Sequence, residues 1–416
     1  MKARVESYGC AANRAYGASM EDTLCTGGFQ LSESSEDADL VIVNTCTVKG
    51  QTEARMVERI RELSRAGKRV IVTGCMATAQ RGLAASLVSA ENVIPLESFQ
   101  SSFGGHATGV SEDLSASLPS LPSKPMGRRA IVPVARGCLG GCTYCIVRLA
   151  VGPLRSYRIA TLISHVKRMV EGGASEIYLT SQDLATFGQD NGETLLALLD
   201  DISRLLGDFR VRLGMMTPNR VAPFVDELLA IMGGDHRFYR FLHLPLQSGD
   251  DTILRLMGRE YHSSDFLSLV GKARRQIPTL NVTTDIIVGF PFENTEAFQN
   301  TMSLIREVLP NKVNISGFTP RPHTVASLLP QTDRRTINER SKEAHGKCRE
   351  VTGLANQKLV GERIEVIPHR GSEGGYLGRA ANFLPVRIKA DRPLKVHSPV
   401  LVHVVGATPS GLVTSV

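Results

Sequence analysis

The stretch Cys138-Leu-Gly-Gly-Cys142-Thr-Tyr-Cys145 directly follows a predicted strand over residues 130–135 and is the strongest signal for the fold and the chemistry of the chain. Three thiolates within eight residues can ligate three irons of a cubane [4Fe–4S] cluster. The fourth iron is then left open to chelate a substrate, and the glycines in the run let the backbone pass close to a bulky inorganic core. The weaker alternatives are a zinc site or three unrelated core cysteines, and zinc is disfavoured because no fourth Cys or His lies nearby at ligand spacing.

Strands and helices alternate around this run. The six candidate strands are 130–135, 176–180, 211–214, 238–244, 281–287 and 313–318, with helical stretches such as 161–171, 194–206 and 295–309 between them. This alternation predicts an α/β fold with a parallel sheet. Six units are fewer than the eight of a closed TIM barrel, so we expect a partial (β/α)6 TIM-like barrel over residues 128–350.

The same alternation begins at the N-terminus. Apolar runs at 3–7, 40–44 and 70–73 read as buried strands, and helical patterns lie near 15–26, 52–66 and 79–89. They predict a doubly wound parallel sheet over residues 1–97. A linker is expected over residues 98–127, whose eight Ser, four Gly and three Pro favour irregular structure.

Cys10, Cys46 and Cys75 each come immediately after one of these N-terminal strands. The carboxyl ends of parallel strands line one crevice of an open sheet, so the three thiols should converge on a second three-thiolate cluster site. We call them the sheet trio, and Cys138, Cys142 and Cys145 the barrel trio. Cys25, expected at a helix core position, and Cys348 lack this context and are interpreted as structural.

Short strands broken by Gly and Pro characterise the C-terminal part. They fall at 364–367, 376–381, 386–388, 400–405 and 412–416, and predict a small all-β barrel over residues 356–416. Residues 351–416 hold eight Lys and Arg against four Asp and Glu, and the 416-residue chain has a net charge of +7. This excess favours a polyanionic partner. With no apolar run long enough for a membrane span and no secretory signal, we expect a soluble, cytoplasmic protein without membrane partners.

The motifs resemble a known family. Cys138-x3-Cys142-x2-Cys145 is the signature of radical S-adenosylmethionine enzymes, and the sheet trio resembles that of their methylthiotransferase branch. The resemblance extends over further motifs at 179–183, 243–249, 284–291 and 318–324, and the C-terminal barrel resembles an OB-like TRAM domain, an RNA-binding module. The runs 145–147, 154–157 and 180–183 are most similar to the archaeal and eukaryotic branch.

That branch consists of transferases that methylthiolate C2 of N6-threonylcarbamoyladenosine at position 37 of tRNA. The resemblance therefore implies radical chemistry with two [4Fe–4S] clusters, two S-adenosylmethionine molecules per turnover, and tRNA, an electron donor and a sulfur donor as partners. The barrel trio would be catalytic through its cluster, and the sheet trio would hold the auxiliary cluster. Val151 departs from the family, whose members carry arginine there.

Polar residues at strand ends are further candidates for cofactor binding. Gln182 and Asp183 end the second barrel strand, Gln247 and Ser248 end the fourth, and Asp285 lies in the fifth. The pair Gly172–Gly173 resembles a glycine pair that contacts the methionyl group, with a helix C-cap as the alternative. Arg321 and His323 either face RNA, as substrate-binding residues, or cap the barrel.

Two other functions compete with this interpretation. One is methylthiolation of an aspartate on a ribosomal protein, which keeps the chemistry and changes the substrate. The other is a non-catalytic iron–sulfur protein that binds RNA. Two open three-thiolate sets argue against the second alternative, because a structural cluster normally has four ligands.

Overall fold

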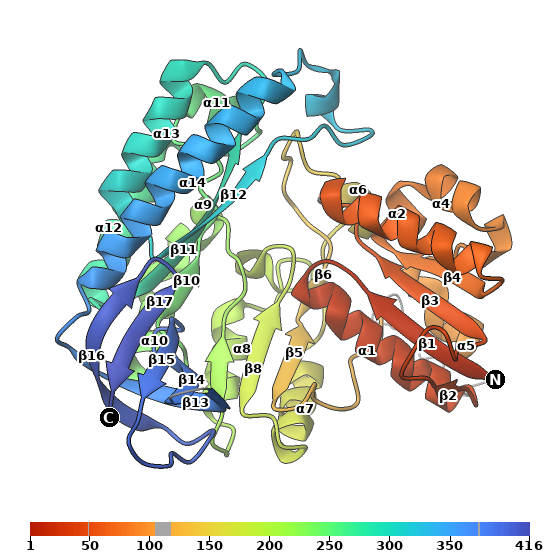
Figure 1. The fold of residues 1–416 in the computed structure, drawn as a ribbon, viewed down its shortest axis with the longest axis horizontal. Helices are drawn as coiled ribbons and strands as arrows, with labels where there is room; N and C mark the ends of the chain where they lie inside the picture. The colour runs from red at the N-terminus through yellow and green to blue at the C-terminus, as the bar shows by residue number, and fades with distance from the viewer. Residues whose placement is uncertain (49, 105–117, 373–374) are drawn as a thin grey trace. The chain divides into compact units, whose positions relative to one another are not determined.

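The computed structural model describes residues 1–48, 50–104, 118–372 and 375–416 (Figure 1). The chain forms two compact units. Unit 1 comprises Met1–Gly140, Tyr144–Leu205 and Thr319–Ser327, and unit 2 comprises Gly141–Thr143, Leu206–Phe318 and Leu328–Val416. None of the helices in the described ranges has the length and apolar character that crossing a bilayer requires.

Unit 1 begins with a parallel sheet of strand order β2-β1-β3-β4. Its elements are β1 Lys2–Ser7, α1 Ala11–Thr26, β2 Gln30–Leu31, β3 Leu40–Thr45, α2 Gly50–Arg65, β4 Arg69–Gly74, α3 Cys75–Ala79 and α4 Arg81–Leu87. Successive residues of a strand face opposite sides of a sheet. Val41 and Val43 accordingly pack with Met56 of α2, whereas Leu40 and Ile42 pack with α1 on the other face. The predicted doubly wound sheet is confirmed.

The expected linker is partly helical. Residues 99–103 form helix α5 (Phe99–Phe103), so the prediction of irregular structure is wrong there. Phe99 is buried in the core beneath α1, and its ring lies 4.8 Å from that of Phe103. Burial of the two rings outweighs the weak helix propensity of the surrounding serines. Residues 105–117 of the expected linker lie outside the described residues.

Unit 1 continues with two of the six predicted barrel strands, β5 and β8, which pair in parallel. The elements are β5 Arg129–Pro133, β6 Ala135–Arg136, α6 Val147–Val151, β7 Arg155–Ser156, α7 Ile159–Glu171, β8 Glu176–Thr180 and α8 Leu195–Ser203. The strand β6 precedes the cysteine run in sequence, and α6 and β7 follow it; the antiparallel pair β6–β7 and the helix α6 were not predicted.

Unit 2 contains the other four predicted strands. Strands β10, β11 and β12 form a parallel sheet, and a bridge from Val211 to Phe238 joins β9 to the segment leading into β10. The elements are β9 Arg210–Arg212, α9 Pro218–Val221, α10 Val225–Gly234, β10 Phe241–His243, α11 Asp251–Leu256, α12 Ser263–Gln276, β11 Asn281–Val288, α13 Thr295–Val308, β12 Lys312–Gly317 and α14 Arg334–Gln357.

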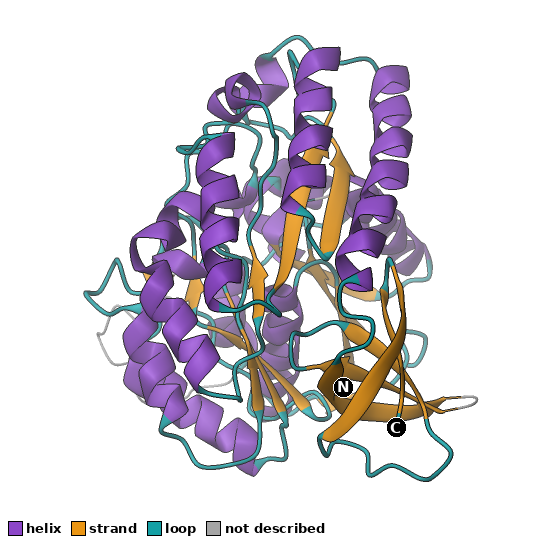
Figure 2. Ribbon diagram, turned by 90° about the vertical axis from the view of Figure 1, so that its left-hand side faces the viewer, coloured by secondary structure: helices purple, strands orange, loops and turns teal. Residues whose placement is uncertain are grey.

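The end of unit 2 is a closed five-stranded barrel of order β13-β14-β15-β17-β16, which confirms the predicted all-β barrel. Its strands are β13 Arg363–Ser372, β14 Gly375–Ala380, β15 Pro385–Lys389, β16 Val400–Thr408 and β17 Gly411–Ser415. Figure 2 shows these curved strands around the C-terminus. Val366, Ile388 and Val404 are among the side chains that fill its interior.

Candidate functional site

The sheet trio lies on the carboxyl edge of the N-terminal sheet. Cys10 caps the start of α1 after β1, Cys46 follows β3, and Cys75 begins α3 after β4. Because β1, β3 and β4 are neighbouring parallel strands, the three residues share one edge. A Cβ atom added at Gly9 would lie 2.6 Å from the Sγ of Cys46, so the backbone before Cys10 runs directly against that cysteine.

The thiol of Cys75 interacts electrostatically with those of Cys10 and Cys46. Burial, together with the charges of the neighbouring Cys10 and Cys46, raises the pKa of Cys75 to about 12. Cys46 is buried, Cys75 is partly buried and Cys10 is exposed, so the edge opens on the side of Cys10. Across the described ranges, no three Cys, His, Asp or Glu side chains are arranged to hold a single metal ion.

The loops that carry the sheet trio are fixed by close backbone packing and a buried amide network. Gly74, directly before Cys75, has φ +78°, and a Cβ there would lie 2.5 Å from Oδ1 of Asn44. The Asn13 amide donates to the carbonyl of Thr45 at 3.0 Å, and the Asn44 amide donates to the carbonyl of Asn13 at 2.7 Å. Three thiols on one rigid edge, backed by glycines, fit a three-thiolate cluster.

A buried guanidinium lies near this edge. Arg136 is 2% exposed, donates from Nε to Glu97 at 3.0 Å and from Nη2 to the carbonyl of Ala150 at 3.3 Å, and lies 5.9 Å from the ring centre of Tyr16. Its charge lowers the pKa of Cys75, in opposition to the larger effect of burial. The carbonyl that it binds precedes Val151, the position where the resemblance leads us to expect an arginine. Sequence reasoning did not identify this residue.

The barrel trio begins in unit 1, at the turn after β6. Gly137 has φ +99°, and any side chain there would overlap the carbonyl oxygen of Pro153. The Gly137 N–H donates to Oε1 of Gln182 at 3.0 Å, and the Gly140 N–H points to the Sγ of Cys138 at 3.2 Å. Gln182, predicted to bind the cofactor, therefore holds the backbone that presents Cys138.

Cys142 belongs to unit 2, where the segment after α11 supports it. Nη1 of Arg259 donates to the Sγ of Cys142 at 3.2 Å. The next residue, Thr143, is bound through its hydroxyl to the carbonyl of Leu256 at 2.7 Å and through its N–H to the carbonyl of Met257 at 3.0 Å. A cation directed at a cysteine sulfur suits a thiolate ligand. Arg259 was not predicted, because it lies far from the cysteines in sequence.

Asp285 lies in a polar row across three neighbouring strands. Its Oδ2 is 2.6 Å from Nε2 of His243 on β10, and its Oδ1 accepts a hydrogen bond of 2.8 Å from the Asn314 amide on β12. All three side chains are partly exposed. They can hold a polar ligand such as an amine, a carboxylate or a base edge. The sequence identified Asp285 and missed its two partners.

Three other predicted cofactor residues have local structural roles. The Asp183 carboxylate accepts from the N–H of Ala185 at the start of a short 3-10 helix. Ser248 is fully buried, and its hydroxyl binds the Asp250 N–H at 3.2 Å. Gln247 has φ +69°, and its backbone bonds to Asp285 and Ile287 place it beside β11. Their positions therefore favour a role in fixing the backbone at the strand ends over contact with a ligand.

The two remaining predicted pairs lie at the end of α7 and in the segment after β12. Gly172 and Gly173 close the end of α7, and they precede β8, so they sit at the amino ends of the strands while the cysteine run follows the carboxyl ends. The helix-cap alternative fits this placement. Arg321 is buried and forms an ion pair with Glu53 of α2, so its guanidinium is engaged within the protein, whereas His323 is exposed.

Cys25 also differs from expectation. It lies in α1 as predicted, but it is exposed because it falls on the side of the helix that faces away from the sheet. Cys348 is buried in α14, as a structural cysteine should be.

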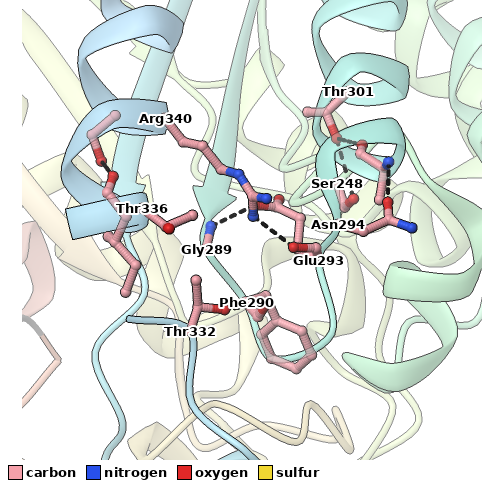
Figure 3. A network of polar contacts seen from close by, with 12 residues as sticks. Ser248, Gly289, Phe290, Glu293, Asn294, Thr301, Thr332, Thr336 and Arg340 are labelled. Carbon is pink, nitrogen blue, oxygen red and sulfur yellow. Dashed lines mark hydrogen bonds and ion pairs between the residues drawn. The ribbon is translucent and has the colours of Figure 1, made fainter. Parts of the chain in front are cut away.

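The loop after β11 is held by a buried ion pair (Figure 3). Nη1 of Arg340 donates to Oε2 of Glu293 at 2.9 Å and to its backbone carbonyl at 2.6 Å. The same Oε2 accepts from the N–H of Gly289 at 2.6 Å. The pair closes the loop that follows the strand of Asp285.

Comparisons with known proteins agree with this architecture. Residues 2–94 match the uncharacterized protein family UPF0004, and residues 132–305 match the radical SAM superfamily. A probable threonylcarbamoyladenosine tRNA methylthiotransferase from Pyrococcus horikoshii is 39% identical over 395 residues, which cover 92% of each chain. This chain belongs to the threonylcarbamoyladenosine tRNA methylthiotransferase family. The human threonylcarbamoyladenosine tRNA methylthiotransferase is 31% identical, over 87% of this chain and 65% of that protein.

Solved structures support the same fold. The radical S-adenosylmethionine methyltransferase TsrM from Kitasatospora setae aligns with a TM-score of 0.54 at 14% identity, over 78% of this chain and 73% of that one. As a member of the radical SAM superfamily, the chain uses a [4Fe–4S] cluster and S-adenosylmethionine. The resemblance stated from its motifs is confirmed.

Proposed function

We propose that this protein methylthiolates C2 of N6-threonylcarbamoyladenosine at position 37 of tRNA, with one [4Fe–4S] cluster on each cysteine trio. The observation that carries the proposal is the sheet trio, a second set of thiols on one edge of a separate sheet. A radical enzyme that only cleaves S-adenosylmethionine needs the barrel trio alone. The relatives' names supply the substrate, and its polyanionic nature matches the basic excess of the C-terminal barrel.

The two cysteine trios have different roles in the proposed reaction. Cys138, Cys142 and Cys145 would hold a cluster that supplies an electron for the reductive cleavage of S-adenosylmethionine, and Cys10, Cys46 and Cys75 would hold one that supplies the sulfur. Gln182 fixes the turn that presents Cys138, and Arg259 holds Cys142. The row of His243, Asp285 and Asn314 offers hydrogen bonds to S-adenosylmethionine or to the adenine. The reaction also requires an electron donor and a sulfur donor. Because the proposed substrate is tRNA, we propose that the protein acts in the cytoplasm.

Two single substitutions test this division. Cys46→Ala should weaken or remove the auxiliary cluster, so the reconstituted enzyme should still release 5′-deoxyadenosine but form no 2-methylthio nucleoside. Cys142→Ala should abolish both products. Cys25→Ala, an exposed cysteine of the same N-terminal sheet domain, is the matched control and should leave both unchanged.

The measurement is mass spectrometry of tRNA nucleosides beside chromatography of 5′-deoxyadenosine, under anaerobic conditions. Near wild-type methylthiolation by Cys46→Ala would contradict the two-cluster proposal. A methylthio group found on an aspartyl ribosomal peptide but never on tRNA would instead support the protein-substrate alternative.

A further inference from the structure

The guanidinium of Arg259 is held at every nitrogen. Nη1 donates to the Sγ of Cys142 at 3.2 Å, Nη2 donates to the carbonyl of Pro245 at 3.3 Å, and Nε donates to the hydroxyl of Tyr261 at 3.2 Å. All of these residues belong to unit 2. The group is therefore fixed in one orientation, with one edge directed at a cysteine of the barrel trio.

Tyr261 holds the guanidinium of Arg259 in place through its hydroxyl. It is 6% exposed, and its hydroxyl proton is shared between the carbonyls of Pro245 at 2.9 Å and Leu246 at 2.7 Å. Burial raises the pKa of Tyr261, and the charge of Arg259 opposes that rise. The phenol thus stays protonated and keeps its oxygen available as an acceptor for Arg259.

The backbone on both sides is packed closely enough to keep the contact in place. Gly258, the residue before Arg259, has φ +71°, and a Cβ there would lie 2.8 Å from the carbonyl oxygen of Gly141. Gly141 is the residue before Cys142. The turn that presents the arginine therefore packs against the turn that presents the cysteine, and at Gly258 no side chain could be added without displacing that backbone.

We propose that Arg259 is a positioning residue that raises the reduction potential of the barrel-trio cluster through its hydrogen bond to Cys142. The inference rests on the cluster in the proposed function. In the step concerned, a one-electron donor loses an electron, the cluster gains it, and no bond breaks. The added negative charge is shared with the thiolate ligands, so a charged donor on one sulfur stabilises the reduced state more than the oxidised one. Arg259 thereby sets how weak a reductant can still reduce the cluster.

The test is a redox titration followed by electron paramagnetic resonance on the full chain. All variants carry Cys10→Ala, Cys46→Ala and Cys75→Ala, so that only the barrel-trio cluster is observed. We expect Arg259→Met to shift the oxidised-to-reduced ratio at a fixed potential about tenfold toward oxidised, a fall of about 59 mV for a one-electron couple. Arg259→Lys keeps the charge but not the fixed geometry, so its reduction potential should lie between those of the background protein and Arg259→Met.

Arg274→Met is the matched control, because Arg274 is also a partly buried arginine of unit 2 that donates to backbone carbonyls, those of Val308 and Leu309, and no hydrogen bond joins it to a cysteine of the described residues. It should titrate like the unsubstituted background. If Arg259→Met takes up no iron, Tyr261→Phe provides the measurement, since loss of the anchor should lower the potential by a smaller amount.

A potential for Arg259→Met equal to that of Arg274→Met would overturn the inference, as would an unchanged Tyr261→Phe where that variant is the one measured. A background protein that binds no iron at all, with Arg259 intact, would instead contradict the proposed cluster. The two failures are therefore distinguishable by iron analysis before any titration.

Discussion

Replacing Arg340 by methionine should destabilise unit 2 strongly at neutral pH. The side chains of Glu293 and Arg340 are 1% and 13% exposed, and Oε1 of Glu293 has no hydrogen-bond partner among the described residues. Removal of one member of a buried ion pair typically costs about 3–5 kcal/mol, because the other charge is left without compensation. At roughly 2–4 °C per kcal/mol for a region of this size, Tm should fall by about 6–20 °C.

The loss should depend on pH in a defined direction. Burial raises the pKa of Glu293 even with Arg340 and the Gly289 N–H beside it. A carboxyl whose pKa is raised in the folded state contributes stability that is present below its unfolded pKa and is lost as pH rises through the folded value. Without Arg340 the folded pKa rises further, so Arg340→Met should cost much less at pH 5 than at pH 8.

The assay is thermal unfolding followed by circular dichroism at both pH values. The double variant Arg340→Met, Glu293→Gln removes both charges of this pair and should recover part of the loss at pH 8. Arg335→Met, which removes an exposed arginine from the same helix, is the control and should leave Tm unchanged. An equal loss at pH 5 and pH 8, or a double variant no more stable than Arg340→Met, would refute the reasoning.

Three further outcomes are expected. Reconstituted protein should bind about eight irons per chain, and alanine at all three cysteines of the barrel trio should leave about four, as iron analysis can establish. His165 is fully buried, and burial lowers its pKa from 6.5 to about 4, so His165→Leu should reduce the loss of stability on acidification between those values, measured by urea unfolding. Arg387→Glu with Lys389→Glu, on the exposed face of β15, should weaken tRNA binding and flatten its salt dependence in filter-binding titrations.

The strands and the cysteine edge could be predicted from the sequence because they depend on local patterns. Apolar runs bounded by glycine or polar residues located β8 at Glu176–Thr180 and located β1, β3 and β4 to within a residue or two. Once those strands were known to be parallel, a cysteine after each one had to lie on the same edge. The sheet trio followed from topology alone.

Other features depend on contacts between distant segments and left no local signal. Arg321 looked like a loop residue available to RNA, but Glu53 lies 268 positions earlier and binds its guanidinium. The helical pattern around Cys25 did not reveal which side of α1 faces the sheet, and the cysteine is exposed. Gly172 satisfied both a cofactor motif and a helix cap, and only its place before β8 distinguishes them.

Arg136 and Arg259 show what a cysteine signature omits. Each cluster that we propose would bring together three thiolates, and a buried anionic centre is stable only when nearby donors or cations compensate it. Arg136 acts on Cys75 from inside unit 1, and Arg259 binds Cys142 inside unit 2. Both guanidiniums are held by carbonyl or carboxylate oxygens, so their positions are fixed before any cluster is bound. In our proposal the cysteines determine where iron binds, and the two arginines provide positive charge beside one cysteine of each trio, which favours a more negative cluster there.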